Sequence, residues 1–391
     1  MPQSPKLRIA LLTYATKPRG SVMQTLYLAE ALQSLGHTVC IFALSKGEGF
    51  CRPMNCETRL IPSQSAPSDV EALVKQRIQE FVDYFEKCDE AYDYYHAQDC
   101  ISANALAILR DSSQKIRHPI PHFIRTIHHI DDYNHPYLQQ CQDRSIRLPD
   151  LCLCVSQYWQ EQILQQYQVH AKRVINGVDT LRFSPSTNEL DSGLESHLQQ
   201  RLHLNGSPIY LTVGGIEPRK NSIALLTAFS QVLKTYPNAQ LVIAGGDTFF
   251  DYSPYREQFF SMVQQTGVSE KSLVLPGTIS DAELPALYRC ADAFTFPSVK
   301  EGWGLVVMEA IATHLPVVTS NIPPFTEFLT DAQAFLVDPN AVDAIAQAML
   351  DVVQPTVAQS LIQHSQSVLS HYTWITAAQM HIKSYCDIQI Q

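Results

Sequence analysis

Two glutamates, Glu301 and Glu309, lie on either side of a predicted strand-to-helix turn. The apolar strand Ala293–Phe296 leads into a loop with glycines at Gly302 and Gly304, and a helix follows that carries Glu309 in its first turns. Backbone N–H groups at such a helix start favour an anion. The carboxylates cannot bind that anion, but they can accept hydrogen bonds from hydroxyl groups on either side of it. A ligand with a phosphate centre and polyhydroxylated ends, such as a sugar nucleotide, meets both requirements.

A second loop could bring positive charge to the same ligand. Gly214 and Gly215 follow a predicted strand and allow close approach of the backbone to a ligand. Arg219 and Lys220 come next, before a helix that Asn221 can cap, and together these cations could neutralise a diphosphate. Taken singly, each loop has an ordinary structural explanation. One glutamate could cap the helix while the other faces solvent, and the basic residues of the second loop could form a solvated turn. Because both loops follow strands of one predicted sheet, their joint placement favours a binding site.

Polar and aromatic residues follow other predicted strands. His96 and His128 each end a strand in the first half of the chain, where an imidazole can hydrogen-bond a sugar hydroxyl or a phosphate. For a single histidine, the alternative is a structural role, in which its ring nitrogens are hydrogen-bonded in the core or at the rim of the fold. The polar and aromatic stretch Asp131–Tyr137 could contact a carbohydrate acceptor or be an exposed loop, and the aromatic loop Phe249–Tyr255 could line a ligand cleft or form a partner surface.

Composition excludes several classes of protein. The net charge of −10 argues against a nucleic-acid binder, which needs a basic face. The ten cysteines form no Cys-x-x-Cys pair and the fourteen histidines show no metal-binding spacing, so neither a zinc site nor a disulfide framework is expected. The chain contains no stretch of eighteen uncharged apolar residues, and its first residues do not resemble a signal peptide. We therefore expect a cytoplasmic protein.

Short apolar runs alternate with amphipathic helical stretches along the whole chain, which is typical of α/β folds with parallel sheets. The strands expected in the first half are Arg8–Thr13, Thr38–Ala43, Thr58–Ile61, Tyr92–His96, Phe123–His128, Leu151–Val155 and Arg173–Ile175. Those expected in the second half are Ile209–Val213, Gln240–Ala244, Ser272–Leu275, Ala293–Phe296, Pro316–Thr319 and Ala334–Val337.

The alternation restarts after a polar stretch, which predicts two domains. We expect a first Rossmann-like domain at residues 1–185, a linker at 186–206, and a second Rossmann-like domain at 207–371. A last helical segment, 372–391, would pack back on the first domain. Two doubly wound domains facing a central cleft would present the carboxyl ends of both sheets to a ligand.

The chain resembles the retaining glycosyltransferases of family 4, which have the two-domain GT-B fold. Glu301 and Glu309 match the Glu-x7-Glu signature of that family, and Asn176–Asp179 matches its Asn-Gly-Val-Asp turn. The resemblance extends from Gly20 to Trp374 through short motifs in the order of the family. These motifs are Pro276-Gly277, Leu287-Tyr288, Ala291-Asp292, Pro297-Ser298, Glu301-Gly302-Trp303-Gly304, Glu309-Ala310 and Pro316-Val317-Val318.

The resemblance implies transfer of a sugar from a nucleotide diphosphate donor with retained anomeric configuration. By analogy, Glu309 would bind the ribose hydroxyls, and Glu301 would hold a hydroxyl of the donor sugar. Arg219 and Lys220 would stabilise the leaving diphosphate, and His128, which matches the Thr-x-His segment of the family, would lie near the donor phosphate and sugar. The implied catalytic set is therefore Arg219, Lys220, Glu301 and His128. No metal or other cofactor is expected.

The same analogy gives a wider set of donor-binding positions. They are Gly20, Ser21, Gly214, Gly215, Gly277, Ile279, Gly302, Trp303, Gly304, Leu305 and Glu309. Two of them depart from the family pattern. Gly215 stands where the family often has arginine, so that Arg219 would have to supply this charge, and Ser21 stands where the family has a second glycine.

Other activities remain open on this scaffold. A phosphorylase or a nucleotide-sugar epimerase would use a similar fold, and a catalytically silent sugar-nucleotide binder or scaffold subunit would keep part of the site. The acceptor could be a glycan, a lipid or a small molecule. The sequence leaves the donor base, the sugar, peripheral membrane contact and the oligomeric state open, and no nucleic-acid partner is expected.

Overall fold

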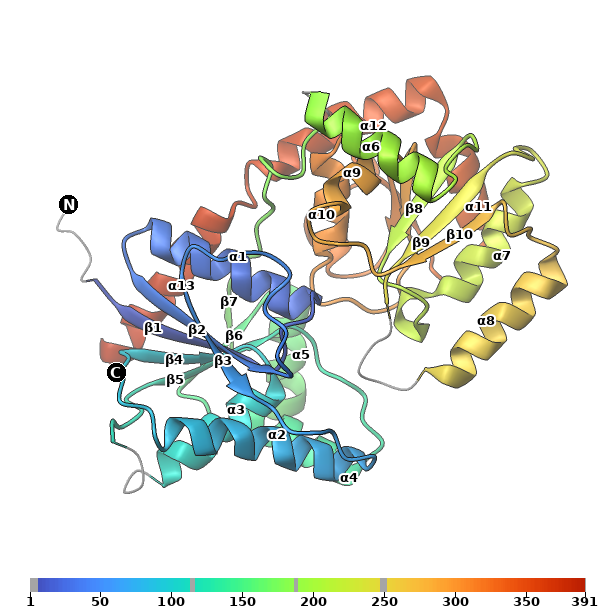
Figure 1. The fold of residues 1–391 in the computed structure, drawn as a ribbon. Coiled ribbons are helices and arrows are strands. Elements are labelled where there is room, and N and C mark those ends of the chain that lie inside the picture. Colours follow the sequence, from blue (N-terminus) through green and yellow to red (C-terminus); the bar gives the residue numbers. More distant parts are fainter. Residues whose placement is uncertain (1–5, 113–116, 186–188, 247–251, 391) are drawn as a thin grey trace. The chain divides into compact units, whose positions relative to one another are not determined.

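The computed structural model describes residues 6–112, 117–185, 189–246 and 252–390. The chain forms two compact units, one made of Met1–Gly177 with Trp374–Gln391 and the other of Val178–Thr373 (Figure 1). The chain passes from the first unit to the second within the Asn-Gly-Val-Asp turn, rather than in the predicted linker at 186–206. The predicted aromatic loop at Phe249–Tyr255 lies partly outside the described residues.

Within the described residues, the first unit contains a seven-stranded parallel sheet in the order β3-β2-β1-β4-β5-β6-β7. Its strands are β1 (Arg8–Thr13), β2 (Thr38–Ser45), β3 (Glu57–Pro62), β4 (Tyr94–Ala97), β5 (Phe123–Ile127), β6 (Leu151–Cys154) and β7 (Lys172–Arg173). The central strands are buried on both faces, which explains why they appear as continuous apolar runs in the sequence. The order reverses at β1 and β4, as in doubly wound sheets.

Helices cover both faces of this sheet (Figure 1). They are α1 (Gly20–Ser34), α2 (Val70–Phe85), α3 (Cys100–Asp111), α4 (Pro136–Arg147) and α5 (Gln157–Tyr167). Asp69, Asp99 and Ser156 cap α2, α3 and α5 with side-chain oxygens, so the sequence itself marks where these helices begin.

The last helix, α13 (Trp374–Cys386), belongs to the first unit. Its Trp374 ring stacks on Tyr27 of α1 with 5.2 Å between ring centroids. Tyr385 stacks on Tyr94 at 5.0 Å, and its hydroxyl lies 2.7 Å from Nδ1 of the fully buried His96. His96 is therefore an interior residue that anchors this helix.

The second unit has, in its described part, a six-stranded parallel sheet in the order β10-β9-β8-β11-β12-β13. The strands are β8 (Ile209–Val213), β9 (Gln240–Ala244), β10 (Leu273–Gly277), β11 (Ala293–Phe296), β12 (Val317–Ser320) and β13 (Phe335–Val337). The α-helices are α6 (Glu189–Arg201), α7 (Ser222–Val232), α8 (Ser253–Thr266), α9 (Leu284–Arg289), α10 (Leu305–Ala312), α11 (Val342–Val352) and α12 (Pro355–Leu369). Both units are thus Rossmann-like α/β domains, as predicted.

Three segments differ from the sequence-based expectation. Helix α6 occupies most of the predicted linker and packs on α9, where Arg289 pairs with Asp191 and Glu195 at 3.0 and 2.6 Å. The sequence predicted no helix between the strands Phe123–His128 and Leu151–Val155, where helix α4 lies, because this helix buries only three of its residues and has a polar composition. Strand β7 pairs with β6 through Lys172 and Arg173, slightly earlier than predicted. Among the described residues, no helix combines the length and apolar character needed to cross a membrane.

Candidate active site

The loop between β11 and α10 turns sharply at Gly304. This residue has a φ of +100°, and a Cβ at this position would lie 2.5 Å from a ring carbon of Phe325. Only glycine fits such a turn. Helix α10 begins at Leu305, and its first turn contains no acidic residue. The positive end of the helix dipole is therefore not neutralised by its own first turn, which suits an anionic ligand.

Glu301, in the same loop, is held between two cations. Its Oε1 lies 2.8 Å from Nζ of Lys220, and its Oε2 lies 2.7 Å from Nη1 of Arg219. The Ser298 hydroxyl also donates a hydrogen bond to Oε1 at 2.7 Å. Only 7% of Glu301 is exposed. The structure thus brings together three of the four residues of the predicted catalytic set.

The charges of this cluster stabilise one another. Burial by itself would raise the pKa of Glu301, but Arg219 and Lys220 lower it to about 2. Burial lowers the pKa of Lys220, and so does the neighbouring Arg219, whereas Glu301 raises it. The carboxylate therefore stays ionised at physiological pH and keeps two cations together that would otherwise repel each other.

Hydrogen bonds join the two loops that carry this cluster. The backbone carbonyl of Arg219 accepts from the N–H of Val299 at 2.9 Å. The Asn221 side chain donates to the carbonyls of Pro297 and Pro339 at 3.1 and 2.7 Å. Asn221 thus joins the two loops, although the sequence suggested a helix cap for it. Since β8 and β11 are neighbouring parallel strands, both loops follow the carboxyl ends of strands on the same side of the sheet.

The glycines after β8 allow close packing of the surrounding backbone and side chains. The N–H groups of Gly214 and Gly215 both donate to the carbonyl of Ala244, at 2.8 and 3.1 Å. A Cβ on Gly214 would lie 2.7 Å from Cε of Lys220, and a Cβ on Gly245 would lie 2.3 Å from the Gly215 nitrogen. These glycines therefore leave room for the Lys220 side chain and for the adjacent loop after β9.

Glu309 occupies a different environment on α10. It is 9% exposed, and its Oε2 accepts a hydrogen bond from the Tyr288 hydroxyl at 2.9 Å. Burial raises its pKa to about 7, while Tyr288 and Arg182 act in the opposite direction and Asp281 adds to the increase. This carboxyl group therefore changes its charge near neutral pH.

The remaining predicted donor positions of this unit line the same sheet edge. Gly277 ends β10 with a φ of +69°, and Ile279 is half-buried two residues later. Gly302 and Trp303 are buried in the loop before α10. The Trp303 ring packs on Phe328 at 4.8 Å between centroids, so its side chain belongs to the interior.

The predicted residues of the first unit also lie where strands end. Gly20 is exposed and begins α1, and a Cβ there would meet no atom within 4 Å. Ser21 follows it and is half-buried. His128 follows β5, and its Nε2 is a buried atom without a hydrogen-bond partner in the structure. Burial and then the positive charge of Arg125 lower the pKa of His128 well below its usual value, so its imidazole is neutral at physiological pH.

Two family models match the chain in succession. The model described as Glycosyltransferase Family 4 matches residues 18–182, and the model described as Glycosyl transferases group 1 matches residues 195–363. The chain belongs to glycosyltransferase family 4. This confirms the predicted family and the predicted class of enzyme, a nucleotide-sugar-dependent hexosyltransferase.

Curated relatives of this family 4 enzyme include mannosyltransferases. The chain is 27% identical over 351 residues to O-antigen chain mannosyltransferase B of Escherichia coli, covering 83% of the chain and 87% of the relative. It is 30% identical over 212 residues to a GDP-mannose-dependent alpha-(1-6)-phosphatidylinositol monomannoside mannosyltransferase of Mycobacterium tuberculosis. That match covers 51% of the chain and 50% of the relative.

Solved structures support the GT-B fold of the family 4 enzyme. The HepE protein of Anabaena, solved with UDP and glucose, superposes with a TM-score of 0.77 at 18% identity, covering 97% of this chain and 99% of that one. Sucrose-phosphate synthase from Thermosynechococcus elongatus superposes with a TM-score of 0.78 at 19% identity, covering 98% and 100%.

The sequence did not assign roles to several residues that surround the two glutamates in this family 4 enzyme. Ser298 hydrogen-bonds Glu301, and Tyr288 hydrogen-bonds Glu309. Arg182 pairs with Asp281 at 2.8 Å close to Glu309. Ser298 and Tyr288 both occur in short family motifs, but those motifs give no indication of which glutamate they contact.

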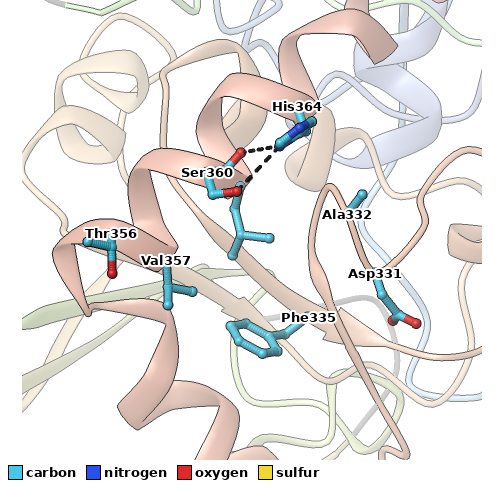
Figure 2. Close-up of a pocket in the computed structure, with 8 residues that line it drawn as sticks. Asp331, Ala332, Phe335, Thr356, Val357, Ser360 and His364 are labelled. Atoms are coloured by element: carbon cyan, nitrogen blue, oxygen red, sulfur yellow. Dashed lines mark hydrogen bonds between the residues drawn. The ribbon is translucent and has the colours of Figure 1, made fainter.

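A cavity of about 400 Å³ lies elsewhere in the second unit of the family 4 enzyme, beside α12 (Figure 2). Its lining includes Phe335, Val357, Leu361, Ser360, His364 and Asp331. None of the predicted site residues lines it. Over the described ranges, no group of three or more His, Cys, Asp or Glu side chains is arranged to hold a metal ion. Independence from metal stays a prediction.

Proposed function

We propose that this enzyme transfers a hexose from a nucleotide diphosphate donor to a hydroxyl acceptor with retention of the anomeric configuration. The observation that carries the proposal is the Glu301 carboxylate held between Arg219 and Lys220. This cluster lies beside the start of α10, where backbone N–H groups favour an anion. One site therefore offers hydroxyl acceptors and anion-stabilising groups side by side.

The proposed chemistry follows from these charges. Breaking the anomeric bond leaves positive charge on the sugar and negative charge on the diphosphate. Arg219, Lys220 and the N–H groups near Leu305 would stabilise the diphosphate as it leaves, and Glu301 would hold a hydroxyl of the sugar. The acceptor oxygen would form the new bond to the anomeric carbon on the face from which the diphosphate leaves, and an oxygen of the leaving phosphate would accept the acceptor's proton. Because two cations balance the diphosphate, turnover is expected to persist in EDTA, and a strict requirement for manganese would contradict the proposal.

Residues of the first unit are also assigned roles by the family pattern. We assign His128 to the donor phosphate and sugar, because its neutral imidazole has a buried Nε2 without a hydrogen-bond partner. Gly20 and Ser21 would offer backbone N–H groups at the start of α1, whose first turn has no acidic residue. Ser21 replaces the second glycine of the family pattern. Of these two residues, only Gly20 lacks a side chain that could block the approach of a ligand to the backbone.

Donor identity is best approached through the relatives. Because the mycobacterial relative is named for its dependence on GDP-mannose, that nucleotide sugar is the first donor to test. Glycans, lipids and small molecules are the acceptor classes to test, since the relatives include an O-antigen chain mannosyltransferase and a phosphatidylinositol monomannoside mannosyltransferase.

The proposal can be tested by thermal shift with GDP, UDP and ADP and with their mannose, glucose and N-acetylglucosamine conjugates, comparing the parent protein with Glu309→Ala. A ligand that binds the native state raises its apparent stability. A shift with one nucleotide, reduced in the variant, would support donor binding in the second unit. Proton NMR of the product anomer would then test retention. Donor binding without transfer or hydrolysis would instead support a silent binder, for which Gly215 in place of the family arginine leaves room.

A further inference from the structure

Tyr288 of α9 is buried against the carboxyl group of Glu309. The tyrosine side chain is fully buried, and its hydroxyl lies 2.9 Å from Oε2 of Glu309 and 3.2 Å from the carbonyl of Val306. Phe183 packs edge-on against the tyrosine ring at 5.7 Å, and Phe294 lies at 5.6 Å. The ring thus has little freedom to move. Its single hydroxyl hydrogen goes preferentially to the shorter contact, the carboxylate, because an ionised acceptor forms the stronger bond.

An ion pair lies beside this contact. Nη2 of Arg182 is 2.8 Å from Oδ1 of Asp281, and the guanidinium also stacks over the Phe183 ring at 5.0 Å. Phe183 in turn contacts Tyr288. Arg182 and Asp281 act electrostatically on Glu309 in opposite directions. The segment Arg182–Phe183 thus acts on Glu309 in two ways. Phe183 packs on Tyr288, and the charge of Arg182 lowers the pKa of Glu309.

We propose that Tyr288, together with the Arg182–Asp281 ion pair, positions the Glu309 carboxylate to accept hydrogen bonds from the ribose hydroxyls of the donor nucleotide. This inference rests on the proposed function, because it assumes that Glu309 contacts ribose. It adds three positioning residues that do not themselves touch the donor. By occupying Oε2 from one side, Tyr288 fixes the plane of the carboxyl group and leaves its other lone pairs for the ribose diol.

The ionised form of Glu309 is the one that accepts two hydroxyl hydrogens. Its pKa of about 7 means that nucleotide binding should weaken as pH falls below neutrality. Among the described residues that influence this carboxyl group, Tyr288 and Arg182 favour the ionised form, whereas Asp281 opposes it. Removing Tyr288 or Arg182 should therefore raise the pH at which binding is half lost, and removing the charge of Asp281 should lower it.

The test measures binding of GDP by isothermal titration calorimetry from about pH 5.5 to about pH 8.5, which spans the expected titration. UDP and ADP follow if GDP does not bind. We expect Tyr288→Phe to weaken binding at pH 7 about 10-fold and to raise the half-binding pH. The 2′,3′-dideoxy analogue of the same nucleotide should bind parent and variant alike, because it lacks the hydroxyls that Glu309 would hold.

Two charge variants keep the proposal testable if Tyr288→Phe disturbs packing. Arg182→Met should raise the half-binding pH, and Asp281→Asn should lower it. General damage to the fold would not produce opposite shifts. The matched control is Tyr210→Phe, because the Tyr210 hydroxyl is also buried but donates to the carbonyl of Met349 at 2.8 Å. It should leave the pH profile unchanged.

The possible failures are distinguishable. If no nucleotide binds the folded parent protein, the proposed function fails, and the inference falls with it. If a nucleotide binds but Tyr288→Phe weakens the dideoxy analogue equally, the positioning role of Tyr288 is wrong. Shifts of the same sign for Arg182→Met and Asp281→Asn would likewise overturn the role of the ion pair.

Discussion

Glu301 and Glu309 are close in sequence and similarly buried, but their pKa values are shifted in opposite directions. Glu301 lies in the loop before α10, between Arg219 and Lys220, with a pKa of about 2. Glu309 lies on α10 with Tyr288 as its hydrogen-bond partner, and its pKa is about 7. Burial raises the pKa of both groups, so the difference comes from the number of cations within contact distance.

One sequence signature therefore contains two different kinds of carboxylate. Glu301 has a fixed charge, because the loop after β8 brings two cations into direct contact with it. Glu309 has a charge that depends on pH, because a hydroxyl and a more distant guanidinium only partly offset its burial. A fixed charge suits a group that must work beside a leaving diphosphate. A titrating group suits a binding contact whose strength follows pH.

The largest effect should come from removing one cation from Glu301. We expect Lys220→Ala to lower kcat about 100- to 1000-fold, because stabilisation of the leaving diphosphate would be lost in the transition state. Steady-state kinetics with the identified donor would measure this, with exposed Lys234→Ala as the control. An unchanged kcat with a raised KM would mean that Lys220 only helps to bind the ground state.

A change at Glu309 should act on binding and on its pH dependence. Glu309→Gln is expected to weaken nucleotide affinity at about pH 8 by roughly 10-fold or more, because the charged acceptor becomes neutral. The parent should lose affinity by up to tenfold per pH unit below about pH 7, and the variant should show a flat profile. Calorimetry across pH measures both, and exposed Glu270→Gln serves as the control. A pH dependence that survives in Glu309→Gln would assign the titration to another group.

The two glutamates should affect the pH dependence of the free energy of unfolding in opposite directions. The folded pKa of Glu301 is depressed, so its contribution is present above its ordinary pKa of 4.5 and is lost as pH falls toward about 2. The folded pKa of Glu309 is raised, so the folded state is destabilised as pH rises from 4.5 through about 7. At about pH 8, Glu301→Gln should lower the free energy of unfolding by about 2 kcal/mol, because Arg219 and Lys220 lose their counter-charge.

Under the same conditions, Glu309→Gln should leave that free energy unchanged or raise it by about 1 kcal/mol. Urea unfolding at about pH 8 and about pH 5 would measure both variants. The advantage of Glu309→Gln should vanish at the lower pH, where the parent carboxyl group is already protonated. Equal destabilisation by the two variants would remove the contrast between the two sites.

The smallest effect should come from Ser298→Ala. This change removes the hydrogen bond from Ser298 to Glu301 but leaves both cations in place, so the carboxylate should stay ionised at neutral pH. We expect a loss of about 1 kcal/mol in stability and no change in the shape of the pH–rate profile near neutrality. A new titration near pH 7 in the variant would mean that Ser298, rather than the cations, keeps Glu301 charged.

Local sequence predicted the elements that are buried on both faces. Strands β1, β8, β9 and β11 have the bounds that their apolar runs indicated. Helix α4 escaped prediction, because most of its side chains face away from the core and its sequence lacks a strong apolar stripe. Helix α6 was hidden for a similar reason, since charged contacts with Arg289 contribute to its docking on α9.

The family, the two α/β units and the positions of the two glutamates could be predicted from the amino-acid sequence, because they follow from local periodicity and from the order of short motifs. It also indicated that Arg219 and Lys220 leave the same sheet edge as Glu301. The three-dimensional fold was needed to show that the cations contact Glu301 and that Tyr288 contacts Glu309. Those contacts join residues 21 to 82 positions apart. Their geometry depends on the turn at each strand end, and short motifs do not specify it.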